Sequence, residues 1–340
     1  MIEIDGSAGE GGGQILRTAL ALSMCTGQPF RLHHIRAKRS KPGLMRQHLA
    51  CVKAARAVCS AEVVGAELGA TVIVFTPNAV RAGNYEFAIA GAGSTLLVLQ
   101  TLLPALLKAD APSTVRISGG THNPMAPPFE FIERAFAPWV QRLGGGLQLT
   151  LRRCGFYPAG GGEFVAVVTP FARDGDAAPL HIAERGALLE SYAEALTAGV
   201  PTSVAPRELD AISRVMNWSG EQLRVRGLRQ NEGPGNALIA TLRYENVTEV
   251  FCELGERGLS SEAVAQRLAK QVRAYMKGDA PIGAHLADQL MLLLAITRRG
   301  SYRATEITEH TRTNATVIER FLPVRIGVDE AAGSVNVLGL

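Results

Sequence analysis

A glycine-rich segment near the start of the chain has the composition of an anion-binding loop. Gly9-Glu10-Gly11-Gly12-Gly13-Gln14 lies between a strand-like and a helix-like segment. Glycines there let backbone N–H groups approach an anion, and a helix N-terminus adds a positive partial charge. The segment lacks the Lys-Ser/Thr of a Walker A loop and the acidic residue of a Rossmann fold, so a purely structural turn is an equal alternative. Because Glu10 would repel a phosphate unless a divalent cation joined them, we expect it to bind a metal.

A basic stretch follows this loop. Between Glu10 and Glu62 the chain has no Asp or Glu. The same stretch carries Arg17, Arg31, Arg36, Lys38, Arg39, Lys41, Arg46, Lys53 and Arg56. Segments of one charge sign commonly contact phosphates, although a solvated basic face is the alternative. The whole chain has a net charge of only +4, too small for a protein that coats nucleic acid. The pair His33-His34 is expected to belong to the basic strand rather than to a metal site.

The remaining composition indicates a globular protein with a sizeable core. Hydrophobic residues make up 47% of the 340 residues and charged residues 19%. The five cysteines contain no CxxC pair and no zinc-ligand spacing, which favours buried free thiols in a reducing compartment. The chain starts with a strand-like segment rather than a signal peptide, and no apolar run is long enough to span a membrane. We therefore expect a cytoplasmic protein without a membrane partner, and the oligomeric state stays open.

The elements that would position these residues repeat along the chain with a period of roughly 80 residues, longer than a solenoid unit. Each unit opens with a glycine-bearing loop that leads into a helix, followed by a strand, a second helix and further strands. In the first unit we expect strands at 30–35 and 71–75 and a second helix at 44–59. In the second unit we expect a helix at 95–108, strands at 114–118 and 147–151, and a helix after Pro127-Pro128.

The third unit is expected to be split by an insertion. Its strands are predicted at 164–168, 302–307 and 335–338, and its helices at 286–297 and 315–321. The intervening segment has strand-like residues 188–193 and 237–244 and a helical pattern at 207–217. We therefore expect an α/β (α+β) fold, with three units in a large domain of residues 1–184 plus 279–340. A smaller α+β domain of residues 185–278 would be inserted in the third unit.

A second glycine-rich segment is more specific. Residues 153–162 read RCGFYPAGGG: a glycine, two residues, a proline, one residue and three glycines. This pattern resembles the signature of the RNA 3′-terminal phosphate cyclase family. The resemblance continues through GEGGGQILR at 9–17, KPGLMRQH at 41–48, AGSTLLVLQT at 92–101, GGTHNPMAPP at 119–128, GPGN at 233–236, LADQL at 286–290, HTRTN at 310–314 and ERFLPVR at 319–325. It therefore covers nearly the whole chain, in order.

The resemblance implies a fold and a reaction. Members of that family have three repeated units, each with two helices and a four-stranded sheet, and an inserted smaller domain. They use ATP and Mg²⁺ or Mn²⁺ to convert an RNA 3′-phosphate end to a 2′,3′-cyclic phosphate. A histidine first takes AMP from ATP, AMP then passes to the RNA 3′-phosphate, and the neighbouring 2′-hydroxyl displaces it.

The resemblance also implies the roles of individual residues. The family's nucleophile matches His310, and its metal-binding glutamate matches Glu10. Its phosphate-handling residues match Arg17, Arg36, Arg39 and Gln47. Its nucleotide-binding positions match Gln100, Pro127, His285, Leu286, Ala287, Asp288 and Gln289, and we group Asn314 with them. This chain departs from the family pattern at Cys154, where Arg or His is usual, and at His122, where Asp is common.

The residues around His310 support that role without establishing it. Asn314 or Thr313 could cap a helix beginning near Ala315, which would place His310 just before a helix N-terminus. That positive end disfavours imidazolium and attracts phosphate, and a neutral imidazole is a usable nucleophile. No ligase-type KxDG lysine is present, so histidine is the only recognised adenylate carrier.

Three other functions fit parts of the sequence. A cyclase-like protein of ribosome assembly would share the motifs but lack the nucleophilic histidine, which is present here as His310. An enolpyruvyl transferase would share a repeated architecture and arginines suited to anionic substrates, without a histidine adenylate. A plain RNA-binding protein would need no ATP.

Overall fold

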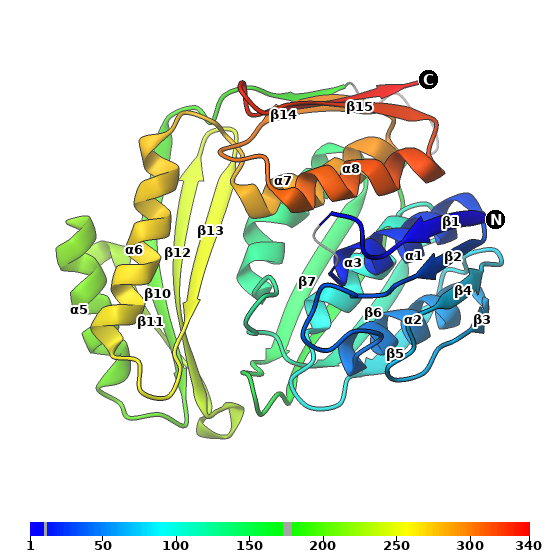
Figure 1. Ribbon diagram of the computed structural model, residues 1–340. Helices are drawn as coiled ribbons and strands as arrows, with labels where there is room; N and C mark the ends of the chain where they lie inside the picture. The colour runs from blue at the N-terminus through cyan, green and yellow to red at the C-terminus, as the bar shows by residue number, and fades with distance from the viewer. Residues whose placement is uncertain (10–11, 173–178) are drawn as a thin grey trace.

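Three of the four sheets share one strand connectivity (Figure 1). The computed structural model describes residues 1–9, 12–172 and 179–340. The first sheet has the order β1-β2-β4-β3, with β1 and β2 parallel and the other pairs antiparallel. Its strands are β1 (Ile2–Asp5), β2 (Phe30–His33), β3 (Glu62–Val64) and β4 (Ile73–Thr76), and its helices are α1 (Gln14–Thr26) and α2 (Arg46–Cys59).

The second unit repeats this plan with the order β5-β6-β8-β7. Its strands are β5 (Asn84–Ala88), β6 (Ser113–Gly119), β7 (Gly146–Arg153) and β8 (Gly162–Thr169). Helix α3 (Thr95–Leu106) starts where the Ser94 side chain accepts a hydrogen bond from the Leu97 N–H. It is apolar nearly all round, as expected of a helix buried on every side. The second helix is a π-helical segment, η1 (Phe131–Phe136), that runs into α4 (Ala137–Arg142).

The third unit has the same connectivity but is interrupted after its first strand. Its sheet has the order β9-β14-β16-β15, again with only the first pair parallel. The strands are β9 (Leu180–Ile182), β14 (Arg299–Arg303), β15 (Val324–Asp329) and β16 (Ser334–Gly339), and the helices are α7 (Ala284–Ile296) and α8 (Glu309–Phe321).

The insertion between β9 and α7 forms the fourth sheet. Its elements are β10 (Leu188–Ala198), α5 (Val204–Met216), η2 (Gly220–Gln222), β11 (Leu223–Gly227), η3 (Gln230–Glu232), β12 (Gly235–Tyr244), β13 (Thr248–Leu254) and α6 (Ser261–Lys277). Among the described strands, these four pair only with one another, in the order β11-β10-β12-β13. Helices α5 and α6 cover the outer face of this sheet, and its other face turns toward the rest of the molecule (Figure 1).

The expected α/β architecture of repeated units is confirmed, with three corrections in detail. The strand predicted at 302–307 begins and ends earlier, as β14 at Arg299–Arg303. The strand predicted at 164–168 does not belong to the third unit, because β8 pairs with β6 and β7 of the second sheet. The helix predicted at 315–321 begins earlier, at Glu309. Across the described ranges, no helix combines the length and apolar sequence needed to cross a membrane.

The helices of neighbouring units pack in a cyclic manner. The second helix of the first unit, α2, contacts α3 of the second unit. Segment η1 of the second unit contacts α7 of the third, and α8 of the third unit contacts α1 of the first. The start of each second helix therefore lies near the first helix of the next unit. Residues that are far apart in the sequence meet at these three contacts.

The substitution Phe30→Ala tests the core contact that joins the first and third units. The fully buried Phe30 ring packs on Phe75 of β4 at 5.8 Å between ring centroids and on Phe321 of α8 at 6.1 Å. Removing the ring leaves a cavity, so we expect the free energy of unfolding, measured by urea denaturation, to fall by about 3–5 kcal/mol. The control Val64→Ala, at an exposed position of β3, should change it by no more than about 0.5 kcal/mol. Equal losses in the two variants would contradict the assigned packing.

Candidate active site

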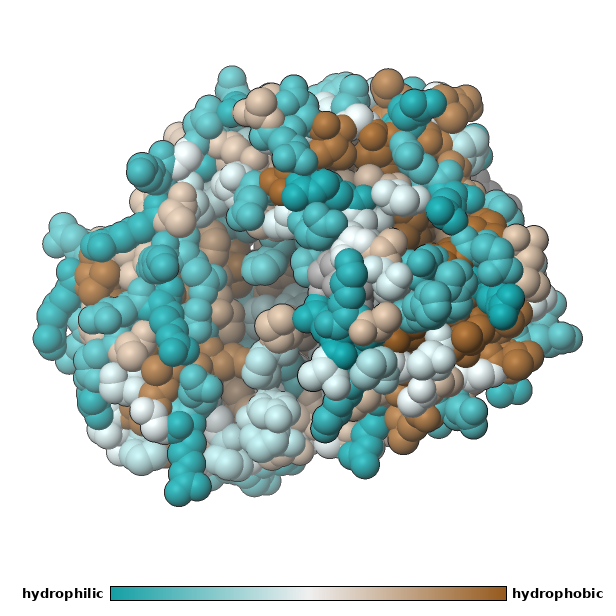
Figure 2. Space-filling view, viewed as in Figure 1, coloured by the Kyte–Doolittle hydropathy of each residue, from teal (hydrophilic) through white to brown (hydrophobic). Residues whose placement is uncertain are grey.

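A large cleft lies between the inserted sheet and the three repeated units. Its volume is about 1130 Å³, and α1, α3, α7, α8, β13 and the loop at 123–128 all contribute to its lining. Figure 2 shows this face of the molecule hollowed at its centre, with hydrophilic side chains around the hollow. The cleft is large enough for a nucleotide-sized ligand.

His310 reaches this cleft from the first turn of α8. The helix begins at Glu309, and the Thr308 side chain caps it by accepting a hydrogen bond from the Thr311 N–H. The prediction that Asn314 or Thr313 caps a later helix is therefore wrong, because Thr308 provides the cap one turn earlier. His310 Nδ1 contacts Gln14 Oε1 at the start of α1. His310 lies within the positive end of the helix rather than before it.

Buried hydrogen bonds hold α8 against α1 and α7. Thr18 of α1 donates to Asn314 Oδ1 at 2.8 Å, and Asn314 Nδ2 donates to the Asp288 carbonyl at 2.9 Å. Thr311 donates to Asp288 Oδ1 at 2.7 Å. Burial raises the pKa of Asp288, while the hydrogen bond from Thr311 and the nearby His310 oppose that shift. Asn314 and Asp288 line the cleft, yet their side chains are engaged in positioning the helix that carries His310.

The glycines of the first motif permit close packing around His310. Gly9 has a φ of +54°, and a Cβ there would overlap the side chain of Thr313 on α8. A Cβ at Gly13 would overlap His48 of α2. The loop can therefore lie against both helices only because these positions are glycine. The predicted metal ligand Glu10 lies outside the described residues.

The basic residues form a group around His48. Burial lowers the pKa of Arg17, which lines the cleft one turn into α1. Burial, together with the charges of Arg17 and Arg36, lowers the pKa of His48 to about 3, so this ring is uncharged at neutral pH. Arg36 donates to the carbonyls of Lys41 and Gly43 at 2.6 and 3.1 Å. No sequence pattern singles out His48, because its low pKa depends on Arg17 and Arg36, which come from two other segments.

The other predicted phosphate-handling residues lie outside the cleft lining. Arg36, Arg39 and Gln47 do not line the cleft, although Arg36 is close enough to His48 to affect its pKa. Gln47 Nε2 donates to the Ser94 carbonyl at 3.0 Å, and Gln47 Oε1 is buried without a partner among the described residues.

Most of the predicted nucleotide-binding residues line the cleft together. Gln100, Pro127, His285, Asp288 and Gln289 do so. Gln100 Nε2 and Gln289 Oε1 are buried, and neither has a hydrogen-bond partner in the described part of the chain. A donor and an acceptor left unpaired in one cleft suit a ligand with complementary polar atoms. By contrast, Leu286 and Ala287 are fully buried in the core and do not line the cleft.

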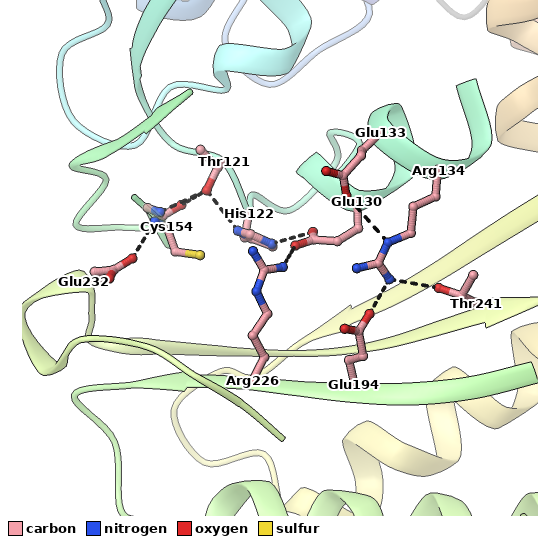
Figure 3. A network of polar contacts seen from close by, with 11 residues as sticks. Thr121, His122, Glu130, Glu133, Arg134, Cys154, Glu194, Arg226, Glu232 and Thr241 are labelled. Carbon is pink, nitrogen blue, oxygen red and sulfur yellow. Dashed lines mark hydrogen bonds and ion pairs between the residues drawn. The ribbon is translucent and has the colours of Figure 1, made fainter. Parts of the chain in front are cut away.

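A buried polar network joins the inserted sheet to the second unit beside this cleft (Figure 3). His122 Nε2 and Glu130 Oε2 are 2.9 Å apart, and both side chains are fully buried. Arg226 of β11 donates to Glu130 Oε1 at 2.6 Å. Burial by itself would raise the pKa of Glu130, but His122 and Arg226 outweigh it and hold the pKa below its ordinary value.

A second set of polar contacts extends this network (Figure 3). Arg134 of η1 pairs with Glu194 of β10 and donates to Thr241 of β12 at 3.1 Å. The Cys154 N–H donates to Glu232 at 2.7 Å. Both departures from the family pattern, His122 and Cys154, therefore lie where the inserted sheet meets the repeated units.

Comparisons with known proteins agree with these motifs. The family model described as RNA 3′-terminal phosphate cyclase matches residues 8–328. Relatives named RNA 3′-terminal phosphate cyclase include a protein of Pseudomonas fluorescens, 50% identical over 96% of this chain and 94% of its own length. Another, from Ralstonia nicotianae, is 53% identical over 96% of this chain and 93% of its own. A third, from Ectopseudomonas mendocina, is 49% identical over 97% of this chain and 95% of its own. The resemblance seen in the sequence is confirmed.

The substitution Glu130→Gln tests the contact between the inserted sheet and the second unit. Removing one partner of a buried ion pair leaves the other charge uncompensated, so we expect a loss of about 3–5 kcal/mol in the free energy of unfolding at neutral pH. The control Glu262→Gln breaks an exposed pair with Arg207 and should leave the free energy of unfolding nearly unchanged.

The same variant should show a defined pH dependence. Because folding lowers the pKa of Glu130, its stabilisation is complete above the ordinary glutamate value of about 4.3 and is lost as the pH falls further. The difference between wild type and Glu130→Gln, measured by urea unfolding, should therefore shrink in acid. A difference that stays constant with pH would contradict the assigned ion pair.

Proposed function

The chain belongs to the RNA 3′-terminal phosphate cyclase family, and we propose that it converts an RNA 3′-phosphate end to a 2′,3′-cyclic phosphate at the expense of ATP. The observation that carries this proposal is the position of His310 in the first turn of α8, facing a cleft with the size and the unpaired polar groups of a nucleotide site. A cyclase-like protein without nucleotidyl transfer would have no use for a histidine held there.

In the proposed first step His310 attacks the α-phosphorus of ATP. The contact between His310 Nδ1 and Gln14 Oε1 supports a tautomer in which Nδ1 donates its hydrogen and the ring lone pair is on Nε2. The Nε2–P bond forms as the bond from the α-phosphorus to the bridging oxygen breaks, and pyrophosphate leaves. The helix N-terminus stabilises the negative charge that gathers on the phosphate oxygens.

The remaining two steps transfer AMP and close the ring. An oxygen of the RNA 3′-phosphate attacks the phosphorus of the histidine adenylate, and the histidine leaves. The adjacent 2′-hydroxyl then attacks the activated 3′-phosphorus, losing its proton, and AMP leaves. That hydroxyl is already next to the reacting phosphorus, so proximity lowers the barrier. The requirement for a 2′-hydroxyl favours RNA over DNA.

Phosphate charge would be neutralised by the basic group and by a cation. Arg17 lines the same cleft as His310, and Arg36 lies close enough to His48 to affect its pKa as Arg17 does. Arg36, Arg39 and Gln47 would contact the phosphate of the RNA end. Charge-assisted hydrogen bonds from arginine suit phosphate oxygens. A carboxylate is a preferred ligand of hard divalent cations, so Glu10 suits Mg²⁺ or Mn²⁺, which would neutralise the departing pyrophosphate.

The adenine would occupy the part of the cleft lined by α3 and α7. Gln100 could donate to a ring nitrogen, and Gln289 could accept from the exocyclic amine. Pro127 and His285 offer flat or apolar surfaces for the base. Asp288 and Asn314 would contribute to the site by holding α8, which carries His310, in place. Leu286 and Ala287 would contribute by packing in the core that supports α7.

We also propose that residues 185–278 form a domain of their own on the body of residues 1–184 plus 279–340. Its separate sheet and the polar contacts across its boundary support this division. In the proposed enzyme it would provide one wall of the cleft.

The substitution His310→Ala tests the proposed function directly. We expect it to eliminate covalent labelling by α-labelled ATP with magnesium and all ATP-dependent cyclisation, because the attacking nitrogen is lost. The wild-type adduct should be acid-labile and alkali-stable, as expected of a phosphoramidate. The control His181→Ala, at an exposed histidine of β9 outside the cleft lining, should retain labelling. An acid-stable adduct, or label retained in His310→Ala, would refute the assignment.

The substitution His285→Ala tests the proposed base contact. Stacking on a base is worth roughly 1–3 kcal/mol, so the half-saturating ATP concentration should rise by about tenfold to a hundredfold. His285→Tyr should retain or improve affinity, because a phenol ring offers more area for stacking. The adenylation rate at saturating ATP should change much less in either variant. Single-turnover adenylation measured against ATP concentration gives both quantities, and equal half-saturation in all three proteins would remove His285 from the nucleotide site.

A further inference from the structure

Three potential metal ligands meet at the ends of β1 and β2, outside the cleft that His310 lines. Asp5 ends β1 and His33 ends β2, and the parallel register pairs them directly. His34 follows with a φ of +53°, a left-handed conformation that is uncommon for a residue other than glycine. In this conformation the centroid of the His34 ring lies 4.7 Å from the centroid of the His33 ring.

The three donor atoms are spaced like the ligands of one small cation. His33 Nδ1 and His34 Nδ1 are 3.1 Å apart, and Asp5 Oδ1 is 3.1 Å from His34 Nδ1 and 3.8 Å from His33 Nδ1. Zinc bonds of about 2.0–2.2 Å in a tetrahedral arrangement separate neighbouring ligand atoms by about 3.3–3.6 Å. The observed distances bracket that range. We propose that Asp5, His33 and His34 bind a divalent transition-metal ion of the zinc class, with water in the fourth position.

The donor chemistry separates this site from the one proposed at Glu10. Two imidazole nitrogens and one carboxylate suit Zn²⁺ and its neighbours, whereas Mg²⁺ prefers oxygen ligands throughout. Hydrogen bonds from the Ser7 backbone at 2.9 Å and the Ser7 side chain at 2.8 Å orient the Asp5 carboxylate. A simple hydrogen-bonded cluster without metal is the alternative that the experiment must exclude.

The position of this site gives the ion a mechanical role. After β1 the chain enters the loop that leads to α1, and after β2 it enters the loop that leads to α2. Lys38 of the second loop already donates to the Gly9 carbonyl of the first at 2.8 Å. A metal bound by Asp5, His33 and His34 would link the two segments at which these loops begin and so restrict the movement of both loops. This inference concerns loop stability and does not depend on the proposed reaction.

Metal titration of the purified full-length chain tests the site. After treatment with chelator, the protein is titrated with Zn²⁺ by calorimetry and with Co²⁺ by visible absorption, which reports four-coordinate geometry. Wild type should bind one equivalent and give the intense spectrum typical of tetrahedral Co²⁺. Asp5→Asn keeps an acceptor for Ser7, and His34→Asn tolerates the left-handed backbone, so both should fold.

Each of these two variants should lose at least about tenfold in affinity, because loss of even a hydrogen bond to a metal ligand typically costs 10–100-fold. The control His181→Ala removes an exposed histidine elsewhere and should bind like wild type. Equal affinity in wild type, Asp5→Asn and His34→Asn, or no binding by wild type, would overturn the proposal.

Limited trypsin digestion supplies a second readout. The exposed Lys38 lies in the loop that the metal would stabilise. Zn²⁺ should slow cleavage there in wild type but not in Asp5→Asn, and Mg²⁺ should have no such effect. The same slowing by Zn²⁺ in both proteins would mean that the ion acts elsewhere and would overturn the proposed role.

Discussion

The buried hydrogen bonds from Thr18 through Asn314 to Asp288 are the constraint on which the site depends. They join α1, α8 and α7, which belong to two different units. A buried polar group that loses its partner costs about 1–3 kcal/mol, so these helices cannot slide past one another cheaply. Apolar packing alone would tolerate small displacements of α8. The directional bonds instead fix the first turn of α8 opposite the start of α1, and with it the contact between His310 and Gln14.

The repeat explains why the candidate nucleophile lies between units. Gln47 is the second residue of α2 and His310 is the second residue of α8. Each contacts the residues that open the first helix of the next unit, Gln47 through the Ser94 carbonyl and His310 through Gln14. In the second unit the helix already begins at Phe129, before the π-helical segment η1, so its second residue is Glu130, which is fully buried and pairs with His122 and Arg226. The architecture thus provides three similar positions, which an amide, a carboxylate and an imidazole fill. Of these, the imidazole of His310 is the side chain proposed to act as the nucleophile.

Sequence patterns predicted the repeated units well because glycine loops and helical periodicity are local signals. Strand pairing is not local, and β8 was assigned to the wrong unit since alternation identifies a strand without identifying its neighbour. The start of α8 was missed because its cap is a threonine pair, Thr308 and Thr311, rather than the usual acidic partner. The grouping of Asp5 with His33 depends on a parallel register that no pattern within either strand specifies.

The titration of the cleft wall fits a polyanionic ligand. The inserted unit contributes Glu208, Glu249, Glu253 and Glu256 to the lining, and ionised carboxylates there would repel phosphates. Burial raises the pKa of Glu208 to about 7 and that of Glu249 to about 8, so both carry a proton much of the time at neutral pH. Glu249 still accepts a hydrogen bond from the Gly283 N–H at the start of α7 at 2.6 Å. Glu249 thereby keeps a directional contact with α7, while Glu208 and Glu249 contribute little negative charge to the cleft. On the opposite side of the cleft, His48 is uncharged and adds no further positive charge beside Arg17. On the side of the repeated units, the positive groups of the lining are therefore Arg17 and the N-terminal turn of α8, which carries His310.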